Sequence, residues 1–240
     1  MGLSHSPNIV TDGLVLCLDA ANPRSYPGSG TSWLDLSGQG NNGTLNGPTF
    51  SNDNSGFLVF DGTDDYVNCG NSLNFDNSFS IGCWMKADSG TNSIYTKGLV
   101  SKYSTFGNYR QYLLGFNEEN SYVNFGFSTN GAGSGATGNL VSSSNGSIIR
   151  NIWYNILGVF NSGSSVKIFI NGELSSSLNT MSISHYSSNV KPLEIGASEA
   201  FDSGVREFNG NISKVIMYNR ALSTKEIRQN YLATKSRFGL

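Results

Sequence analysis

FNGNISKVIMYNRALSTKEIRQNYLATKSRFGL, residues Phe208–Leu240, is the stretch that decides the fold. It opens with an apolar run, Ile212–Tyr218, which predicts a strand that ends at a polar turn. Ser223 follows at a position where it can cap a helix, and Glu226 stands three residues later, where it can reach back to the cap. This capping box predicts one short helix over residues 223–234.

The rest of the chain consists of short apolar runs separated by turn residues, with no helical period between them. In Phe79–Ala87 the apolar residues alternate, so Phe79, Ile81, Cys83 and Met85 share one face and Trp84 lies on the other. We expect Trp84 and Trp153 to be core residues. Strands are expected at residues 14–18, 33–36, 57–60, 66–68, 79–87, 99–102, 109–116, 122–127, 152–160, 166–170, 193–196 and 212–218. The pattern predicts an all-β fold, a sandwich of two antiparallel sheets with one short C-terminal helix.

The sequence shows no internal repeat, linker or shift in composition, which predicts a single domain over residues 12–240. A polar N-terminal arm, residues 1–11, precedes it. We expect this arm to serve as an attachment or oligomerisation segment, and terminal fraying is the alternative.

Composition excludes several classes of function. The net charge is −2 and the 15 Lys and Arg residues are scattered, so nucleic-acid binding is not expected. No window is apolar enough for membrane insertion, and the first twelve residues lack the apolar stretch of a secretory signal. The three cysteines, Cys17, Cys69 and Cys83, are an odd number, and we expect them to be buried free thiols in a chain that folds in a reducing cytosol.

Three groups of residues resemble the laminin-G-like, concanavalin A-like jelly-roll domains. The groups are Asp12–Asn22 with Trp33–Gly38 and Asn41–Thr44, then Phe60–Val67 with Phe79–Met85, and last Phe208–Ile212 with Tyr218–Ile227. The resemblance implies a jelly roll whose loops bind carbohydrates or proteins, often with a calcium ion at the rim of the sandwich. A shared fold does not transfer function by itself.

The order of these segments, and the closing Ala233–Gly239 stretch, also resemble proteins encoded by phages. The resemblance implies a non-enzymatic virion-surface protein, either a capsid decoration or a tail-associated adhesion protein, made in the host cytoplasm. Its partners would be other virion proteins and host surface glycans, and it could form a homo-oligomer. The alternative is a secreted or cell-surface module, extracellular, that binds carbohydrate or protein.

A glycoside hydrolase is the least favoured reading of the sequence. Glycoside hydrolysis needs a pair of carboxylates, and glucanases of this fold carry them in a Glu-x-Asp-x-x-Glu run, which the chain lacks. Glu118 and Glu119 are adjacent, so on a strand they would face opposite sides, and we expect them at a hairpin tip. The only histidines, His5 and His185, accompany no nucleophile elbow, and no catalytic residue is predicted.

Asp61, Asp64 and Asp65 crowd into one loop and predict a calcium site, because calcium binds carboxylate oxygens. The alternative is a solvated turn in which Asp61 and Asp64 bond their own backbone. Relatives carry an acidic pair where this chain has Ser213-Lys214, so any contribution of those acids to metal binding is absent here.

Loop aromatics predict where a sugar would bind, because sugars stack on aromatic rings and hydrogen-bond to polar neighbours. The alternative is that these side chains fill or cover the sandwich core. The candidates are Tyr103, Phe106, Tyr109, Tyr186 and Phe201.

Overall fold

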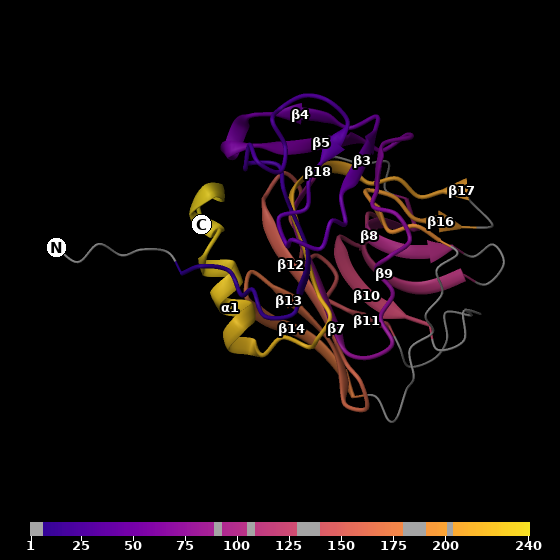
Figure 1. Cartoon of the computed structure of the whole chain (residues 1–240). Helices are drawn as coiled ribbons and strands as arrows, with labels where there is room; N and C mark the ends of the chain where they lie inside the picture. Colours follow the sequence, from indigo (N-terminus) through magenta and orange to yellow (C-terminus); the bar gives the residue numbers. More distant parts are fainter. Residues whose placement is uncertain (1–6, 89–92, 105–108, 129–139, 180–190, 201–203) are drawn as a thin grey trace.

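The computed structural model describes residues 7–88, 93–104, 109–128, 140–179, 191–200 and 204–240. It confirms the predicted fold class, since two antiparallel sheets pack face to face as a sandwich and α1 (Thr224–Leu232) lies near the C-terminus (Figure 1). Two short 3-10 turns accompany it, η1 (Asp53–Ser55) and η3 (Lys235–Phe238). Among the described residues, no helix combines the length and apolar character that a membrane crossing requires.

Sheet A is eight-stranded within the described residues, in the order β14-β13-β12-β7-β18-β5-β4, and β1 also pairs with β18. On one side of β18, β5 pairs with its first half and β1 with its second half, while β7 pairs along the other side. The strands are β1 (Leu14–Asp19), β4 (Thr49–Ser51), β5 (Phe57–Asp61), β7 (Phe79–Ala87), β12 (Tyr154–Asn161), β13 (Ser165–Ile170), β14 (Glu173–Asn179) and β18 (Asn209–Tyr218).

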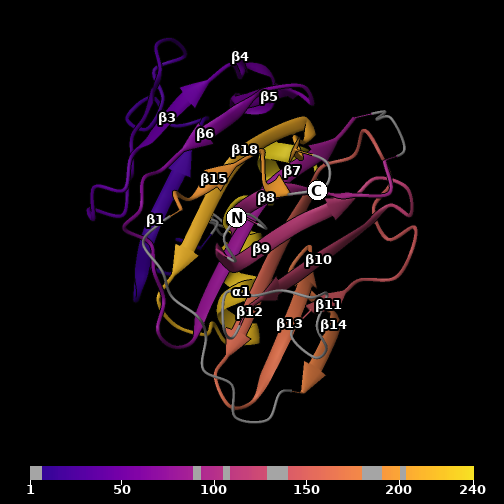
Figure 2. The same ribbon diagram turned by 90° about the vertical axis from the view of Figure 1, so that its right-hand side faces the viewer.

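Sheet B follows the order β11-β10-β9-β8-β15-β6-β3-β2, with β16 and β17 attached beside β8. Figure 2 shows strands of both sheets with their labels. The strands are β2 (Ser32–Trp33), β3 (Gly43–Asn46), β6 (Tyr66–Asn68), β8 (Thr96–Ser104), β9 (Tyr109–Asn117), β10 (Tyr122–Phe127), β11 (Leu140–Ser142), β15 (Glu194–Ile195), β16 (Glu199–Ala200) and β17 (Gly204–Val205).

The core between the sheets is aromatic and aliphatic. The alternation predicted for β7 is confirmed, because Phe79, Ile81, Cys83 and Met85 all belong to the inner core. Phe79 lies at its centre, with ring centroids 4.9 Å from Phe75, 5.4 Å from Tyr112 and 5.5 Å from Phe160. Offset and tilted pairs of this kind add to the stabilisation from burial.

The outer face of sheet A is also apolar, and α1 covers part of it. Ile227 of α1 is fully buried against a second cluster that includes Leu157 and Tyr218. The predicted capping box is confirmed: the Ser223 hydroxyl accepts from the Glu226 backbone N–H, and the Glu226 carboxylate accepts from the Ser223 backbone N–H at 2.9 Å.

Part of the predicted arm packs on the same face. Val10 is buried, and its N–H donates to Asn230 Oδ1 at 2.8 Å. The Tyr218 hydroxyl donates to the Val10 carbonyl at 2.9 Å and accepts from Asn230 Nδ2 at 3.0 Å. Asn230 therefore joins the helix, the last strand and the segment that precedes β1.

Phe238 of η3 closes the remaining part of this outer face. Its ring stacks on Trp84 with a centroid separation of 4.1 Å, and it lies 4.8 Å from Trp153. The Trp84 indole N–H donates to Thr234 Oγ1 at 2.8 Å. Both tryptophans are buried as predicted, but Trp84 and Trp153 belong to this outer cluster and not to the core between the sheets.

A buried ion cluster fixes the C-terminal segment beside this aromatic group. Arg237 donates to both carboxylate oxygens of Asp19, at 2.9 and 3.0 Å, and Lys214 Nζ lies 3.2 Å from the same carboxylate. Ser213 Oγ donates to the Gly56 carbonyl at 2.7 Å. Ser213, which also accepts from Arg237 at 3.1 Å, thus holds the C-terminal segment and the residue before β5 against β18, while Lys214 binds Asp19 of β1.

Most of the predicted strands have different bounds in the structure. The strand expected over residues 193–196, for example, spans only Glu194–Ile195. The strand expected over residues 33–36 is wrong beyond Trp33, because the Asp35 carboxylate instead accepts backbone N–H groups from Cys17, Ser37 and Asn41. This hydrogen bonding folds residues 34–42 into a compact loop. The strand expected from Ile152 begins two residues later, at Tyr154.

We expect the substitution Asp19→Asn to destabilise the protein by about 3 kcal/mol, because it leaves the buried Lys214 and the half-buried Arg237 without their carboxylate. Burial alone would raise the pKa of Asp19, but Lys214 and Arg237 outweigh it and hold the pKa below its ordinary value. Asp19 therefore stabilises the fold above its ordinary pKa, and this stabilisation is lost as the pH falls through the folded-state value.

Denaturant unfolding at several pH values tests this prediction. The difference between wild type and Asp19→Asn should shrink at the acid end, and the exposed Asp53→Asn variant should match wild type throughout. Equal stabilities of Asp19→Asn and wild type at neutral pH would contradict it.

Candidate functional site

The outer face of sheet B is polar, in contrast with that of sheet A. Thr44, Asn68, Glu194 and Ser101 occupy paired positions on β3, β6, β15 and β8. Their chain neighbours on the same strands belong to the inner core, namely Leu45, Val67, Ile195 and Val100. Because successive side chains of a strand point to opposite faces, the four polar side chains form a row on the outside.

Only part of this polar row is accessible. Ser101 is fully buried, and its hydroxyl donates to the Ala197 carbonyl at 2.7 Å. Thr44 is exposed, while Asn68 and Glu194 are half-buried. These three residues present a hydroxyl, an amide and a carboxylate, which are groups that bind sugar hydroxyls.

Asn124 on β10 adds an unsatisfied acceptor to the same face. It lies between the core residues Val123 and Phe125, so its side chain points outward, and it is almost fully buried. Its Nδ2 donates to Thr96 Oγ1 at 3.0 Å, but its Oδ1 has no hydrogen-bond partner in the part of the chain that the structure describes. A buried acceptor of this kind calls for a water molecule or a ligand donor.

The sequence reasoning did not anticipate the carboxylate pair Glu194 and Glu199. Burial raises the pKa of Glu194, whereas for Glu199 hydrogen bonds from Lys191 and Ser104 outweigh burial and lower the pKa. The two glutamates are five residues apart, as in the Glu-x-Asp-x-x-Glu run, but Gly196 stands in place of the aspartate.

Gly196 also breaks the strand on which such a pair would lie. β15 ends at Ile195, and Gly196 has a φ of 83°, outside the range of extended backbone. Glu199 sits on β16 with its carboxylate bound by Lys191. The pair therefore lacks the continuous strand that would hold both carboxylates toward one sugar.

Of the predicted sugar-binding aromatics, the structure describes Tyr103 and Tyr109. Both are half-buried at the same end of β8 and β9, where Tyr103 pairs with Arg110 and Ser104 pairs with Tyr109. The Arg110 guanidinium lies 5.8 Å from the centre of the Tyr103 ring. Phe106, Tyr186 and Phe201 lie outside the described residues.

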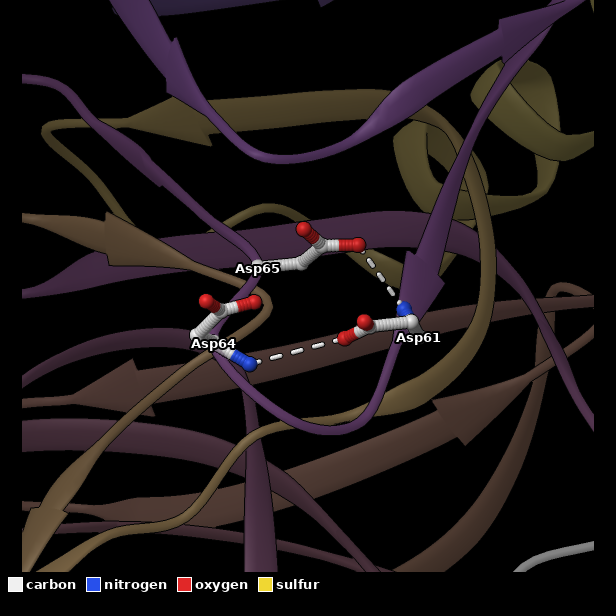
Figure 3. A group of neighbouring side chains, drawn as sticks. All are labelled: Asp61, Asp64 and Asp65. Atoms are coloured by element: carbon white, nitrogen blue, oxygen red, sulfur yellow. Dashed lines mark hydrogen bonds between the residues drawn. The ribbon is translucent and has the colours of Figure 1, made fainter.

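Asp61, Asp64 and Asp65 come together at the end of β5, as predicted. One carboxylate oxygen from each lies within 4.8 Å of the others. Figure 3 shows Asp65 turned toward the Asp61 backbone. The Asp65 carboxylate accepts a hydrogen bond from the Asp61 N–H at 2.9 Å. The Asp61 carboxylate accepts hydrogen bonds from the N–H groups of Thr63 at 2.8 Å and Asp64 at 3.5 Å, so the turn predicted as the alternative is present for Asp61.

The surroundings of Asp65 fit a cation. It is 6% exposed, and burial is the main cause that raises its pKa, followed by the charges of Asp61 and Asp64. Gly47 leaves room for its carboxylate, since a Cβ at that position would lie 1.9 Å from Asp65 Oδ1. These three carboxylates could hold a calcium ion, which would remove the repulsion among them.

Glu207 is a fourth carboxylate near this group, and the sequence reasoning missed it. Burial raises its pKa, and the charges of Asp61 and Asp64 add to that effect. Asn209, two residues on, pairs with Asp61 across β18 and β5. Lys214 is five residues further along β18, about 16 Å away, so the Ser213-Lys214 departure is remote from these acids.

Residues 61–228, more than half of the chain, match the family described as the concanavalin A-like lectin/glucanases superfamily. The chain belongs to this superfamily. The match begins at Asp61 and runs into α1, so it includes the acidic loop, the polar row on β6, β15 and β8, and the capping box. No curated protein sequence matches the chain.

Solved structures share the fold at low sequence identity. The binding domain of Paraclostridial Mosquitocidal Protein 1 is 16% identical, with a TM-score of 0.70 over 92% of this chain and 52% of that one. The botulinum neurotoxin serotype D ligand binding domain in complex with N-acetylneuraminic acid is 14% identical, with a TM-score of 0.67 over 92% and 51%. The Trypanosoma rangeli sialidase in complex with sialic acid is 14% identical, with a TM-score of 0.66 over 98% and 36%. The chain thus spans about half of the toxin domains and about a third of the sialidase.

We expect calcium to raise the melting temperature, because a ligand that binds only the folded state stabilises it, by about 2.7 kcal/mol at a hundredfold excess over Kd. Asp65→Asn should abolish the shift while keeping an oxygen to accept the Asp61 N–H, and Asp53→Asn should retain it. Since the pKa of Asp65 is raised, the calcium effect should weaken at a higher pH than for an ordinary aspartate. Equal melting temperatures in millimolar calcium and in chelator would rule out the site.

Proposed function

We propose that the chain is a non-enzymatic glycan-binding module whose ligand face is the outer face of sheet B. The observation that carries the proposal is the contrast between the two outer faces of the sandwich. The outer face of sheet A is apolar and closed by α1, the segment around Val10, and Phe238. The outer face of sheet B instead carries the row that includes Thr44, Asn68 and Glu194.

The chemistry of this face suits neutral hydroxyl-rich ligands. Its amide and carboxylate oxygens accept hydrogen bonds from sugar hydroxyls, and the Asn124 acceptor lies unsatisfied on the same face. Tyr103 follows the inward-facing Lys102 on β8, so its ring lies on the outer face, where it can stack on the C–H face of a sugar. Tyr109 pairs with Ser104 and therefore points to the opposite face. Membership in a lectin and glucanase superfamily agrees with this ligand class.

Hydrolysis is not part of the proposal. The candidate carboxylates Glu194 and Glu199 stand on different strands, and Lys191 binds Glu199. A hydrolase needs one carboxylic acid and one free carboxylate facing each other across the scissile bond.

We propose further that the module is displayed on a virion surface, as a capsid decoration or a tail-associated adhesion protein. The resemblance to phage-encoded proteins supports this role. The segment before β1 is bound on the sheet A side through Val10 and Asn230, opposite the proposed ligand face. An attachment through this segment would leave sheet B facing outward. A secreted or cell-surface module is the alternative.

A glycan array with the whole chain tests ligand binding. We expect the chain to bind at least one glycan. Thr44→Ala should lower the affinity for that glycan roughly five-fold for each hydrogen bond lost. Thr49→Ala is the matched control, because Thr49 is also exposed but lies on the edge strand β4 of sheet A. Equal losses from both variants would remove sheet B as the ligand face, and release of sugar product would overturn the non-enzymatic proposal.

Particle proteomics tests the location. In purified particles of a phage that encodes the chain, we expect its peptides at a fixed ratio to capsid or tail proteins, and antibody labelling of intact particles. Absence from particles, together with recovery from the host surface or medium, would favour the alternative.

A further inference from the structure

Lys102 on β8 is a fully buried cation at one end of the sandwich. Its Nζ donates to the Asn71 carbonyl at 2.7 Å and to Asn74 Oδ1 at 2.6 Å. Both acceptors belong to the segment that crosses from β6 in sheet B to β7 in sheet A. The lysine therefore ties a strand of one sheet to the connection between the two sheets.

In the part of the chain that the structure describes, the ammonium has neutral acceptors and no opposite charge beside it. Within the described residues it forms no ion pair with a carboxylate. Tyr112, its partner in the β-ladder, packs against Phe75 and Phe79 at 5.7 and 5.4 Å. Burial lowers the pKa of Lys102 to about 8, so a substantial share of neutral amine is present at mildly alkaline pH. A desolvated lysine of this kind is a nucleophile.

The carboxamide of Asn74 faces this amine and is polarised. Its Oδ1 accepts from Lys102 and also from Gln111 Nε2 at 3.3 Å, while its Nδ2 donates to the Asn71 carbonyl at 2.9 Å. The carboxamide carbon is one C=O bond, about 1.2 Å, beyond the contacted oxygen. Gln111 is itself almost fully buried, which favours a strong effect of its N–H on the carbonyl.

We propose that Lys102 and Asn74 form an intramolecular isopeptide bond. The lone pair of the neutral Lys102 amine attacks Asn74 Cγ, and a Cγ–Nζ bond forms. The Cγ–Nδ2 bond breaks, and a proton passes from the attacking nitrogen to the leaving nitrogen, which departs as ammonia. No oxidant, reductant or cofactor is required, because the reaction exchanges one amide for another.

The proximity of the Lys102 amine to the Asn74 carboxamide accelerates this reaction. Amides react slowly with free amines, but well-oriented groups within one molecule reach effective concentrations of about 10⁵–10⁸ M. The fixed contact between Lys102 and Asn74 provides that orientation. The product would be a cross-link between residues 28 positions apart. Such a link would reinforce a sandwich whose three cysteines are all free.

Intact-mass spectrometry of the purified, denatured chain tests the proposal. After incubation of the folded protein at mildly alkaline pH, we expect a loss of ~17 Da, the mass of the ammonia released. Protease digestion should give one branched peptide that joins Lys102 to Asn74. A mass equal to that of the sequence, or a loss of ammonia mapped to other residues, would overturn the proposal.

Variants locate the reaction. Lys102→Arg and Asn74→Ala should each show the full mass calculated from the variant's own sequence, with no loss. Asn74→Asp should lose water, ~18 Da, in place of ammonia if the same carbon is attacked. Lys86→Arg is the matched control and should retain the loss of ~17 Da, because its amine lies near Phe57 and Trp153 on the other sheet. The wild-type measurement decides the proposal even where a variant does not fold. It is independent of glycan binding.

Discussion

Sheet A is apolar on both faces, and the rest of the structure depends on keeping its outer face from water. Its central strands β7, β12 and β18 are buried along almost their whole length. A sandwich covers only one face of each sheet, so the other must be polar or find its own cover. Here the cover comes from both ends of the chain, with Val10 and Ile227 on one half and Phe238 on the other. The ion cluster around Asp19 fastens the last part of that cover.

The outer faces of the two sheets therefore differ in role. Sheet A uses α1, the segment before β1 and η3 to cover its outer face, and a small cavity remains beneath them, lined by residues that include Trp84, Asn155 and Asn230. On sheet B, the outer face carries accessible polar residues along β3, β6 and β15, although Leu140 of β11 is an exposed apolar residue on the same face. The acidic loop follows β5 at the end of sheet A, and the next strand, β6, carries Asn68 of the polar row on sheet B. The candidate cation site and the candidate glycan face are therefore consecutive along the chain.

The sequence predicted those features that depend on local chemistry. The capping box of Ser223 and Glu226, the alternation in β7 and the acidic loop are short-range patterns that need no tertiary information. β14 was missed because its residues, ELSSSLN, carry neither a steady alternation nor β-branched side chains. Glu207 was missed for another reason, because only the folding of distant segments brings it to Asp61. Lys191 is eight residues from Glu199, and their contact depends on how the short segment between them folds. No spacing in the sequence predicts such contacts.

The pairing of β1 with β18 has a kinetic consequence. Leu14 pairs with Tyr218, and Asp19 binds Arg237 across 218 positions, so the contacts that complete sheet A join opposite ends of the chain. Closing so long a loop costs conformational entropy before the contacts form that offset it. Proteins dominated by such pairings fold slowly. Until the ends meet, the apolar outer face of sheet A remains open to other chains. The newly made protein is thus most vulnerable to aggregation in this interval. A chaperone that shields β7 and β12 would protect the chain until its two ends have packed on sheet A.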